Sequence, residues 1–317
     1  MDQYALVLGL PHTNHLGLAE HLLLMQAGHF HWTSLARAIG TPLSSLRTPT
    51  GQAVYATFYF IEERFPDEAL PNAFQLDDCL NFAVFSRAFK GIAVESQIVF
   101  NRDARLGDWL ATAPATLSDE VAQAHPYLRL ATIFITPEAG NSRLKVANPA
   151  GVDFSGMALL PNDENPYQLT RLARQTGALG LVGDGWNAID PPEGFEARYA
   201  IDIDRDTNGA GLVYFANYVT IMDRAEREAM HASSRKFSDL EIAGRVVQER
   251  RLAYFGNVST RDCIRTRVHL FPYRQDASRI ALRYEMRREE DGDLICMSEA
   301  VKVLGRAPDG RVPADAA

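Results

Sequence analysis

The chain has 317 residues, of which 46% are hydrophobic and 23% are charged, and its formal net charge is −8. This composition is that of an ordinary globular protein and excludes a disordered or fibrous one, while the length predicts two domains. The negative charge argues against a general nucleic-acid binder or a protein that binds acidic membranes, because phosphate groups attract basic surfaces.

The cysteines and the apolar segments restrict the cellular compartment. Cys79, Cys263 and Cys296 form neither a CxxC pair nor an even set for disulfides, which fits small buried thiols in a reducing compartment. No stretch reaches the roughly 18 apolar residues of a membrane span. The N-terminus also lacks the charged and apolar blocks of a signal peptide. We therefore expect a cytoplasmic protein that does not interact with a membrane.

The first half of the chain predicts one long helix followed by strands. Apolar residues recur at helical spacing from Gly17 to Ala38, and Gly40 and Pro42 supply stop signals. The segments that follow are rich in β-branched and aromatic residues, which is typical of strands. These segments are Ala53–Phe65, Leu80–Phe89, Gly91–Phe100 and Leu128–Thr136.

The middle of the chain, residues 137–195, is dense in turn formers and contains one short helical pattern, Tyr167–Gln175. We expect it to be a connection packed over the surface. The second half repeats the order of the first, with a short strand, a helix initiated at a glycine and further strands. The strands are expected at Ala197–Ile203, Arg250–Asn257, Asp262–Phe271, Arg279–Glu289 and Leu294–Gly305.

Two short sequence echoes indicate a duplication. Thr13-Asn14-x-x-Gly17-Leu18 returns as Thr207-Asn208-x-x-Gly211-Leu212, an offset of 207 − 13 = 194. Asp78-Cys79-Leu80 returns as Asp262-Cys263-Ile264, an offset of 262 − 78 = 184. Both echoes accompany the same order of elements. We therefore predict two homologous domains, residues 1–136 and 196–317, joined by the connecting segment 137–195.

One long apolar helix wrapped by antiparallel strands is the hotdog arrangement, so the predicted fold class is α+β, a double hotdog. The stretch DTNGAGLVYFANYVTIMDRAERE, residues 206–228, resembles the acyl-thioester hydrolase signature of that superfamily. This signature is an Asp or Asn, then a G-x-V-Y run that leads into a further Tyr, then an acidic residue two turns on. The later stretch LAYFGNVSTRDCI is similar to the strand pair that follows in those enzymes.

Over essentially all of its length the chain resembles a narrower family, the double-hotdog bifunctional acyltransferase/decarboxylases of leinamycin-type polyketide biosynthesis. The resemblance rests on GLAEHLLLMQAGHFHW, on the following VYATF strand and on the total length. It implies decarboxylation of methylmalonyl-CoA and transfer of propionyl to the phosphopantetheine thiol of an acyl carrier protein, with no further cofactor. A tyrosine is implicated as the acyl acceptor in that family, and Tyr55 matches it by position.

The site can also be argued from the residues. Loss of carbon dioxide from a malonyl thioester gives an enolate, whose oxyanion needs fixed donors. A helix start preceded by glycine offers free N–H groups, so both repeated entrances are candidate thioester sites. Capping and turn formation would also explain such polar residues, and the sequence leaves open which cleft is active. The predicted catalytic residues here are Asn14, His15 and Asn217, and the predicted substrate-binding residues are Gly17, Asp206, Asn208 and Gly211.

Tyr55 and Tyr59 share one face of their predicted strand because side chains alternate. We therefore predict Tyr55 as catalytic and Tyr59 as substrate-binding. Aromatic residues in strands are usually core or cross-strand partners, and only the family resemblance favours catalysis. A tyrosine needs a neighbouring base or donor network to act as a nucleophile. The hydroxyl could instead hydrogen-bond the carbonyl or the departing carboxylate.

Five of the eight histidines lie near the first entrance, at positions 12, 15, 21, 29 and 31. Their spacing does not match HExxH or a Cys/His finger, so we expect no metal site. His15 is the best placed of them for proton transfer.

Three functions from different classes stay open on the sequence. The first is decarboxylation with acyl transfer, in which the choice between malonyl and methylmalonyl is undetermined. The second is a thioesterase, with Asp206 as the base that activates water, or a dehydratase-like enzyme, with His15 paired with Asp206 or Glu20. The third is a carrier-protein docking subunit without turnover.

The expected partners are a coenzyme A thioester and an acyl carrier protein, with no nucleic acid. Carrier proteins are acidic, so basic residues near the cleft are candidates for the contact: Arg37, Arg47, Arg87 and Lys90. A fused pair can close its own cleft, but double hotdogs often pair further, so a monomer and a homodimer both stay open.

Overall fold

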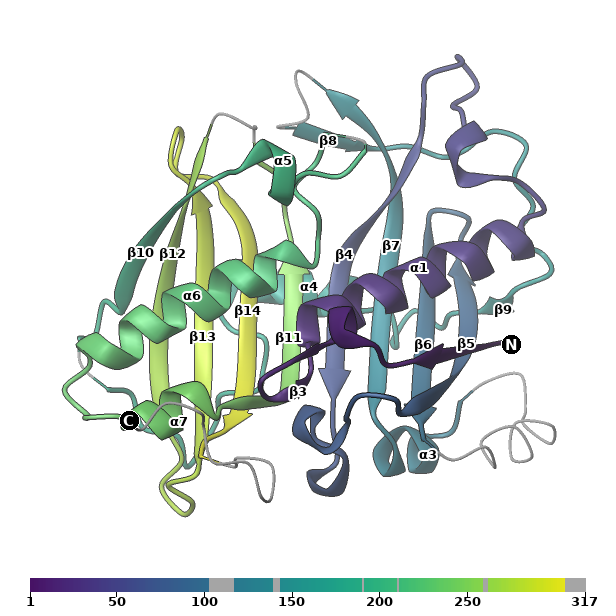
Figure 1. Ribbon diagram of the computed structural model, residues 1–317. Coiled ribbons are helices and arrows are strands. Elements are labelled where there is room, and N and C mark those ends of the chain that lie inside the picture. The colour runs from purple at the N-terminus through teal and green to yellow at the C-terminus, as the bar shows by residue number, and fades with distance from the viewer. Residues whose placement is uncertain (103–116, 139–142, 190, 210, 259–261, 306–317) are drawn as a thin grey trace.

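The computed structural model describes residues 1–102, 117–138, 143–189, 191–209, 211–258 and 262–305. Two long helices lie on one face of a large sheet (Figure 1). They are α1 (Glu20–Ala38) and α6 (Asn217–Ala232). The short helices are α3 (Asp119–Ala124), α4 (Tyr167–Thr176), α5 (Ile203–Asp206) and α7 (Asp239–Ala243). Among the described residues no helix is long and apolar enough to cross a membrane.

In the described part of the chain the sheet has twelve strands, ten of which follow the order β1-β5-β6-β7-β4-β11-β14-β13-β12-β10. The strands of the first half are β1 (Asp2–Val7), β4 (Tyr55–Arg64), β5 (Cys79–Phe89), β6 (Ala93–Asn101) and β7 (Tyr127–Glu138). Those of the second half are β10 (Phe195–Ala200), β11 (Val246–Tyr254), β12 (Cys263–Pro272), β13 (Arg279–Arg288) and β14 (Leu294–Val303). Two short strands lie off this order: β8 (Arg143–Val146) pairs with β7, and β9 (Ala158–Leu159) pairs with β5.

The two halves of the sheet repeat each other around the central pair β4 and β11. At one edge β1 pairs with β5, and Val7 lies opposite Cys79. At the other edge β10 pairs with β12, and Ala200 lies opposite Cys263. The offsets are 200 − 7 = 193 and 263 − 79 = 184, which reproduce the two sequence offsets to within one residue. The predicted α+β double hotdog is confirmed.

Each repeated entrance forms a tight hairpin and not the first turn of a helix. In the first half β2 (Thr13–Asn14) pairs with β3 (Gly17–Leu18), and in the second half Thr207 bridges Val213. Gly17 has a φ of +106°, and a Cβ atom there would lie 2.7 Å from the carbonyl oxygen of Phe74. The helices therefore begin later than expected, at Glu20 and Asn217. The predicted helix starts at the two glycines were wrong, because a positive φ and a close backbone contact favour a turn.

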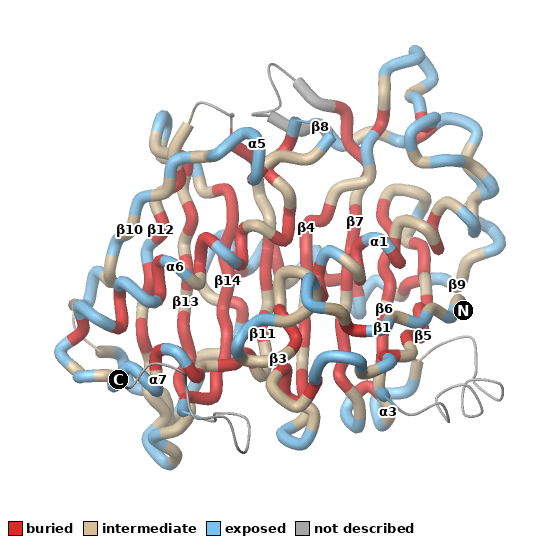
Figure 2. Tube along the Cα trace, in the orientation of Figure 1, coloured by how far each residue is buried: buried red, intermediate tan, exposed pale blue. Residues whose placement is uncertain are grey.

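Both long helices bury an apolar stripe against the sheet, and buried residues also run along the middle of the strands (Figure 2). In α1 the stripe includes Leu23, Ala27 and Phe30, which have the spacing of one helix face. The connecting segment covers the opposite face of the sheet, where Ala173 and Leu179 pack in a cluster with Phe60. Its predicted short helix is confirmed as α4.

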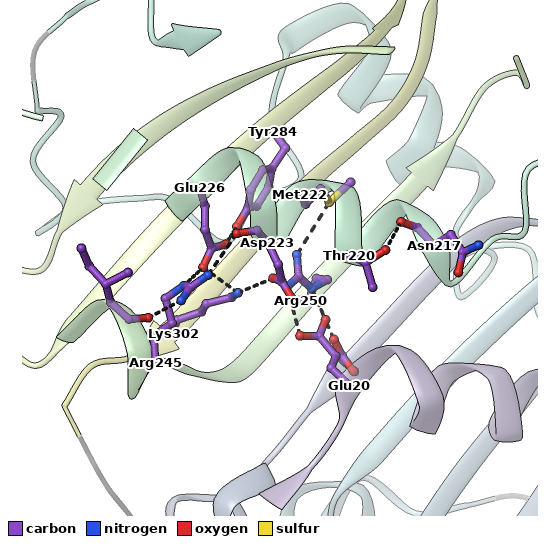
Figure 3. Close-up of polar contacts among 12 residues, drawn as sticks. Glu20, Asn217, Thr220, Met222, Asp223, Glu226, Arg245, Arg250, Tyr284 and Lys302 are labelled. Carbon is purple, nitrogen blue, oxygen red and sulfur yellow. Dashed lines mark hydrogen bonds and ion pairs between the residues drawn. The ribbon is translucent and has the colours of Figure 1, made fainter. Parts of the chain in front are cut away.

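A buried group of charged side chains joins the two halves (Figure 3). Arg250 of β11 has no exposed surface, and its Nη2 lies 3.1 Å from Oε2 of Glu20 on α1. Its Nε lies 3.4 Å from Oε1 of Glu63 on β4, and its Nη2 lies 3.7 Å from Oδ1 of Asp223 on α6. Beside it Lys302 contacts Asp223 and Glu226 at 2.8 and 2.9 Å. We name this group the interdomain charge cluster.

The carboxylates of the cluster differ in protonation. Burial opposes ionisation of Glu226, but Lys302 and Arg245 lower its pKa to about 2. Burial and the neighbouring charge of Glu20 raise the pKa of Glu63 well above its usual value. Glu63 is therefore buried as the neutral acid, whereas Glu226 is ionised.

Replacing Glu63 by Gln is expected to make stability less sensitive to alkaline pH. The folded-state pKa of Glu63 is raised, so between the unfolded pKa of about 4.3 and the folded pKa only the folded state keeps the proton. Wild-type stability then falls as pH rises through that window, by up to about 1.4 kcal/mol per pH unit for this group. Glutamine does not titrate. Urea unfolding of both proteins from pH 5 to 8 should show an advantage of Glu63→Gln that grows with pH. A pH-independent difference would contradict the assignment of Glu63 as a neutral acid.

Candidate active site

A cavity shared by the two halves of the chain lies where β4 and β11 separate. These strands pair from Phe60 opposite Ala253 to Arg64 opposite Glu249. Beyond this paired part, residues 55–59 and 254–257 line a cavity of about 490 Å³. At the other end the pairing continues, because Phe65 N–H donates to the carbonyl oxygen of Gln248 at 2.7 Å. We call the boundary between β4 and β11 the central seam. Its strands are therefore separated at one end only.

Both halves of the chain line this cavity, and aromatic side chains form its inner wall. Phe215, which precedes α6, lies with its ring centroid 4.5 Å from that of Phe58 and 5.7 Å from that of Trp32 on α1. The backbone of α1 comes close to this wall at Gly28, where a Cβ atom would lie 2.6 Å from Cζ of Phe215. The close approach of the Phe215 ring therefore explains why the residue at position 28, in the middle of a helix, is a glycine.

Replacing Gly28 by Ala is expected to narrow the larger cavity without unfolding α1. Alanine is the better helix former by about 1 kcal/mol, but its methyl group would displace Phe215 toward the cavity. If the cavity binds an acyl thioester, the Kd of propionyl-CoA, measured by calorimetry, should rise about tenfold, the equivalent of about 1.4 kcal/mol. Gly156→Ala is the matched control, because no atom lies within 4 Å of the added Cβ. Equal Kd values for the two variants would contradict this role of Gly28.

Four tyrosines line the cavity, and three of their hydroxyl groups are already bonded. Tyr59 donates to Oδ1 of Asn165 at 3.0 Å, and burial raises its pKa, so it stays protonated. Tyr218 donates to Oδ1 of Asn257 at 3.2 Å, and Tyr254 donates to the carbonyl oxygen of Phe215 at 3.0 Å. The side chain of Tyr55 is 37% exposed, and its hydroxyl makes no hydrogen bond to any residue of the described chain. Tyr55 therefore offers a free hydroxyl to a ligand.

Two asparagines also line the cavity. Asn208, in the second entrance, accepts from the N–H of Leu212 at 3.1 Å. Asn257 follows β11 and is 4% exposed. Asn257 was not among the predicted site residues. The available signal was a Gly-Asn pair at the end of a strand whose neighbour carries Tyr55.

The other residues predicted for the second entrance have structural contacts and do not line the cavity. Asp206 is 2% exposed, and its Oδ2 accepts from the Tyr199 hydroxyl at 2.9 Å and from the Asp202 N–H at 2.8 Å. Asn217 donates from Nδ2 to the carbonyl oxygen of Arg205 at 3.2 Å. Gly211 has a φ of +71° within the hairpin.

The first entrance opens on a separate, smaller cavity of about 160 Å³, lined by Asn14 and His15. Asn14 accepts from the N–H of Leu16 at 2.8 Å, and Nε2 of His15 lies 3.1 Å from the carbonyl oxygen of Ala243. Its other walls include Glu20, Asp223 and Lys302 of the interdomain charge cluster. The predicted site residues are thus divided between two cavities, with Tyr55, Tyr59 and Asn208 in the larger one.

The histidines of the first half serve different purposes. His31 is fully buried between Ser96 and Thr132, and burial lowers its pKa to about 3. His12 accepts from the N–H of Gly9 at 3.0 Å. Within the described ranges no three His, Cys, Asp or Glu side chains are grouped so that they could hold a metal ion.

One candidate for the carrier contact is excluded by its surroundings. Arg87 is 5% exposed and pairs with Glu95 at 2.6 Å, so it cannot present its charge to a partner. Arg47 donates to the carbonyl oxygen of Ser44, a residue that lines the larger cavity. Arg37 pairs with Asp2, and Lys90 lies over the ring of Phe89.

The described polar lining of the larger cavity consists of hydroxyl, amide and indole groups. These come from Ser44, Thr57, Asn208, Asn257, Trp32 and the four tyrosines. Among the described residues that line it there is no Asp, Glu, His, Lys, Arg or Cys. The arrangement can therefore donate hydrogen bonds to an oxygen in an otherwise apolar space.

The fold and the shared cavity define the class as that of fused double-hotdog proteins. An acyl-ACP thioesterase from Bacteroides thetaiotaomicron has the same fold, with a TM-score of 0.56, 11% identity and coverage of 95% of this chain and 97% of that one. A 12:0-ACP thioesterase from Umbellularia californica matches with a TM-score of 0.56, 8% identity and coverage of 96% and 97%.

The family model described as the LnmK N-terminal Hot Dog Fold domain matches residues 13–180, which is 180 − 13 + 1 = 168 of the 317 residues. The chain belongs to this family. A search of the curated proteins found no match.

Proposed function

We propose that this protein decarboxylates malonyl-CoA or methylmalonyl-CoA and transfers the resulting acetyl or propionyl group to the phosphopantetheine thiol of an acyl carrier protein. The observation that supports this proposal most directly is the larger cavity, which offers hydrogen-bond donors without a described carboxylate, imidazole or thiol. Loss of carbon dioxide from a malonyl thioester requires no base, because the electron pair of the broken bond between the α-carbon and the carboxylate forms the enolate.

The decarboxylation step fits a cavity that is lined both by apolar side chains and by hydrogen-bond donors. The bond between the α-carbon and the carboxylate breaks, carbon dioxide leaves, and the electron pair forms the enolate of the thioester. Apolar walls disfavour the buried carboxylate, whereas fixed donors stabilise the enolate oxygen. The α-carbon then takes up a proton, and the carrier thiol attacks the carbonyl while coenzyme A leaves as the thiol.

Tyr55 is the proposed group that contacts the reacting acyl unit. Its hydroxyl has no hydrogen-bonding partner among the described residues, whereas those of the other three cavity tyrosines are bonded. No base lies beside it in the described lining, which supports a role as a hydrogen-bond and proton donor more than one as an acyl acceptor. Asn208 is proposed to contact the thioester from the second entrance.

The alternatives would need side chains that lie elsewhere. A thioesterase that used Asp206 would need this carboxylate at the substrate, but it is enclosed by Tyr199 and the Asp202 backbone. A dehydratase-like enzyme that used His15 would work in the smaller cavity. We therefore favour decarboxylation in the larger cavity over both.

The test is intact mass spectrometry of a phosphopantetheinylated carrier protein incubated with this protein and each of the two acyl-CoA substrates. A carrier that gains acetyl or propionyl mass, and never the additional carboxylate, would support the proposal and identify the substrate. Free coenzyme A beside an unmodified carrier would instead indicate hydrolysis, and no change would support the docking function.

A further inference from the structure

The side chain of Asn257 is held in one orientation at the wall of the larger cavity. The backbone carbonyl oxygen of Asn257 accepts from Nη1 of Arg288 at 2.9 Å. The backbone N–H of the preceding Gly256 donates to the carbonyl oxygen of Ile295 at 3.2 Å. These contacts fix the backbone just after β11, where the seam with β4 has opened.

The amide oxygen of Asn257 is fully used. Oδ1 accepts from the Val258 N–H at 2.9 Å, the Tyr218 hydroxyl at 3.2 Å and the Val213 N–H at 3.3 Å. An amide oxygen has two lone pairs, so three donors leave it no capacity for a ligand. They also determine which end of the amide is oxygen, because the amino end could not accept any of the three bonds.

The amide nitrogen has the opposite environment. Nδ2 makes no hydrogen bond to any residue in the described part of the chain, although Asn257 is 4% exposed and lines the cavity. A rigid donor of this kind at a cavity wall provides what a developing oxyanion needs, since it is already oriented before the reaction.

We propose that Asn257 is a catalytic residue whose Nδ2 donates a hydrogen bond to the thioester carbonyl oxygen and stabilises the enolate formed as carbon dioxide leaves. This inference rests on the proposed function. The electron pair of the broken bond moves onto the carbonyl oxygen and returns when the α-carbon is protonated. Asn257 gains and loses no proton. Tyr55 then acts on the substrate from β4, on the other side of the open seam.

The test compares Asn257→Asp and Asn257→Ala with the wild type in steady-state release of carbon dioxide. The aspartate keeps an oxygen for the three donors but loses the amino group. It therefore tests the amino group separately from the amide oxygen. We expect kcat to fall about 10²- to 10³-fold with KM changed only a few-fold, as for loss of one oxyanion donor. Asn187→Ala is the matched control, because Asn187 is exposed and contacts Arg274. A raised KM with unchanged kcat, or no change in either, would overturn the inference.

A second measurement separates this inference from the proposed function. The infrared carbonyl band of bound [1-¹³C]propionyl-CoA reports hydrogen bonding to the carbonyl oxygen whether or not the protein turns over. We expect the band at lower wavenumber in the wild type than in either Asn257 variant. Identical bands would overturn the assignment. If the wild type releases no carbon dioxide from either substrate, the proposed function fails, while a band shift would still support Asn257 as the carbonyl donor.

Discussion

Replacing Tyr55 by phenylalanine is expected to abolish most of the turnover and leave the fold intact. The hydroxyl bonds no described residue and the side chain is 37% exposed, so its removal should not change the free energy of unfolding. If the hydroxyl acts on the acyl group as a donor, its loss should lower kcat about 10²- to 10⁴-fold. Carbon dioxide release and thermal unfolding of the same preparation measure the two effects.

Two further tyrosines serve as comparisons for Tyr55→Phe. Tyr167 on α4 is 57% exposed and does not line the cavity, so Tyr167→Phe should retain wild-type activity. Tyr59→Phe removes a buried hydrogen bond to Asn165 and should cost about 1 kcal/mol of stability. Full activity of Tyr55→Phe would reject the role proposed for Tyr55.

Replacing Arg250 by methionine is expected to be the most destabilising of the substitutions considered. Arg250 is fully buried and contacts Glu20, Glu63 and Asp223, so its loss leaves an ionised carboxylate without its partner. Breaking a buried pair in this way costs about 3–5 kcal/mol. Equilibrium unfolding in urea at pH 7 would measure the loss.

The double variant Arg250→Met/Glu20→Gln tests the cause of this loss. Removing the charge of Glu20 as well should recover part of the stability, because the penalty comes from the uncompensated carboxylate. Arg198→Met is the control, since Arg198 pairs with Glu289 but is 64% exposed on its side chain, and surface pairs contribute little. Equal effects of Arg250→Met and Arg198→Met would contradict a stabilising interdomain charge cluster.

Much of the fold could be predicted because its pattern is local. Alternation and β-branched residues located the central strands to within a few residues, as for Leu294–Val303 and Arg279–Arg288. The sequence analysis missed β1 (Asp2–Val7), because an edge strand of six residues with alternating burial carries a weak signal. The helix starts were misjudged because the hairpin around Gly17 depends on contact with the distant Phe74.

The candidate site could be predicted only in part, because it depends on how the halves meet. Tyr55 and Asn208 come from different domains, and spacing along the chain could not show that they line one cavity. The orientation of the Asn257 amide is set by Val213, Tyr218 and Val258, which donate to its oxygen from other parts of the fold. The pairing of His15 with the Ala243 carbonyl oxygen, 228 residues away, is equally invisible in the sequence.

The unequal ends of the seam follow from joining the two domains in one chain. In a symmetric dimer of identical hotdogs, each substitution would alter both clefts together. Here the end at the first entrance keeps only the smaller cavity, whose walls include the interdomain charge cluster, and the end at the second entrance holds the larger cavity. Joining the two halves in one chain therefore lets substitutions alter the larger cavity while the interdomain charge cluster continues to hold the halves together. Residues of the larger cavity such as Leu212 and Ile133 could therefore be varied to accept other acyl groups without disturbing the interdomain charge cluster.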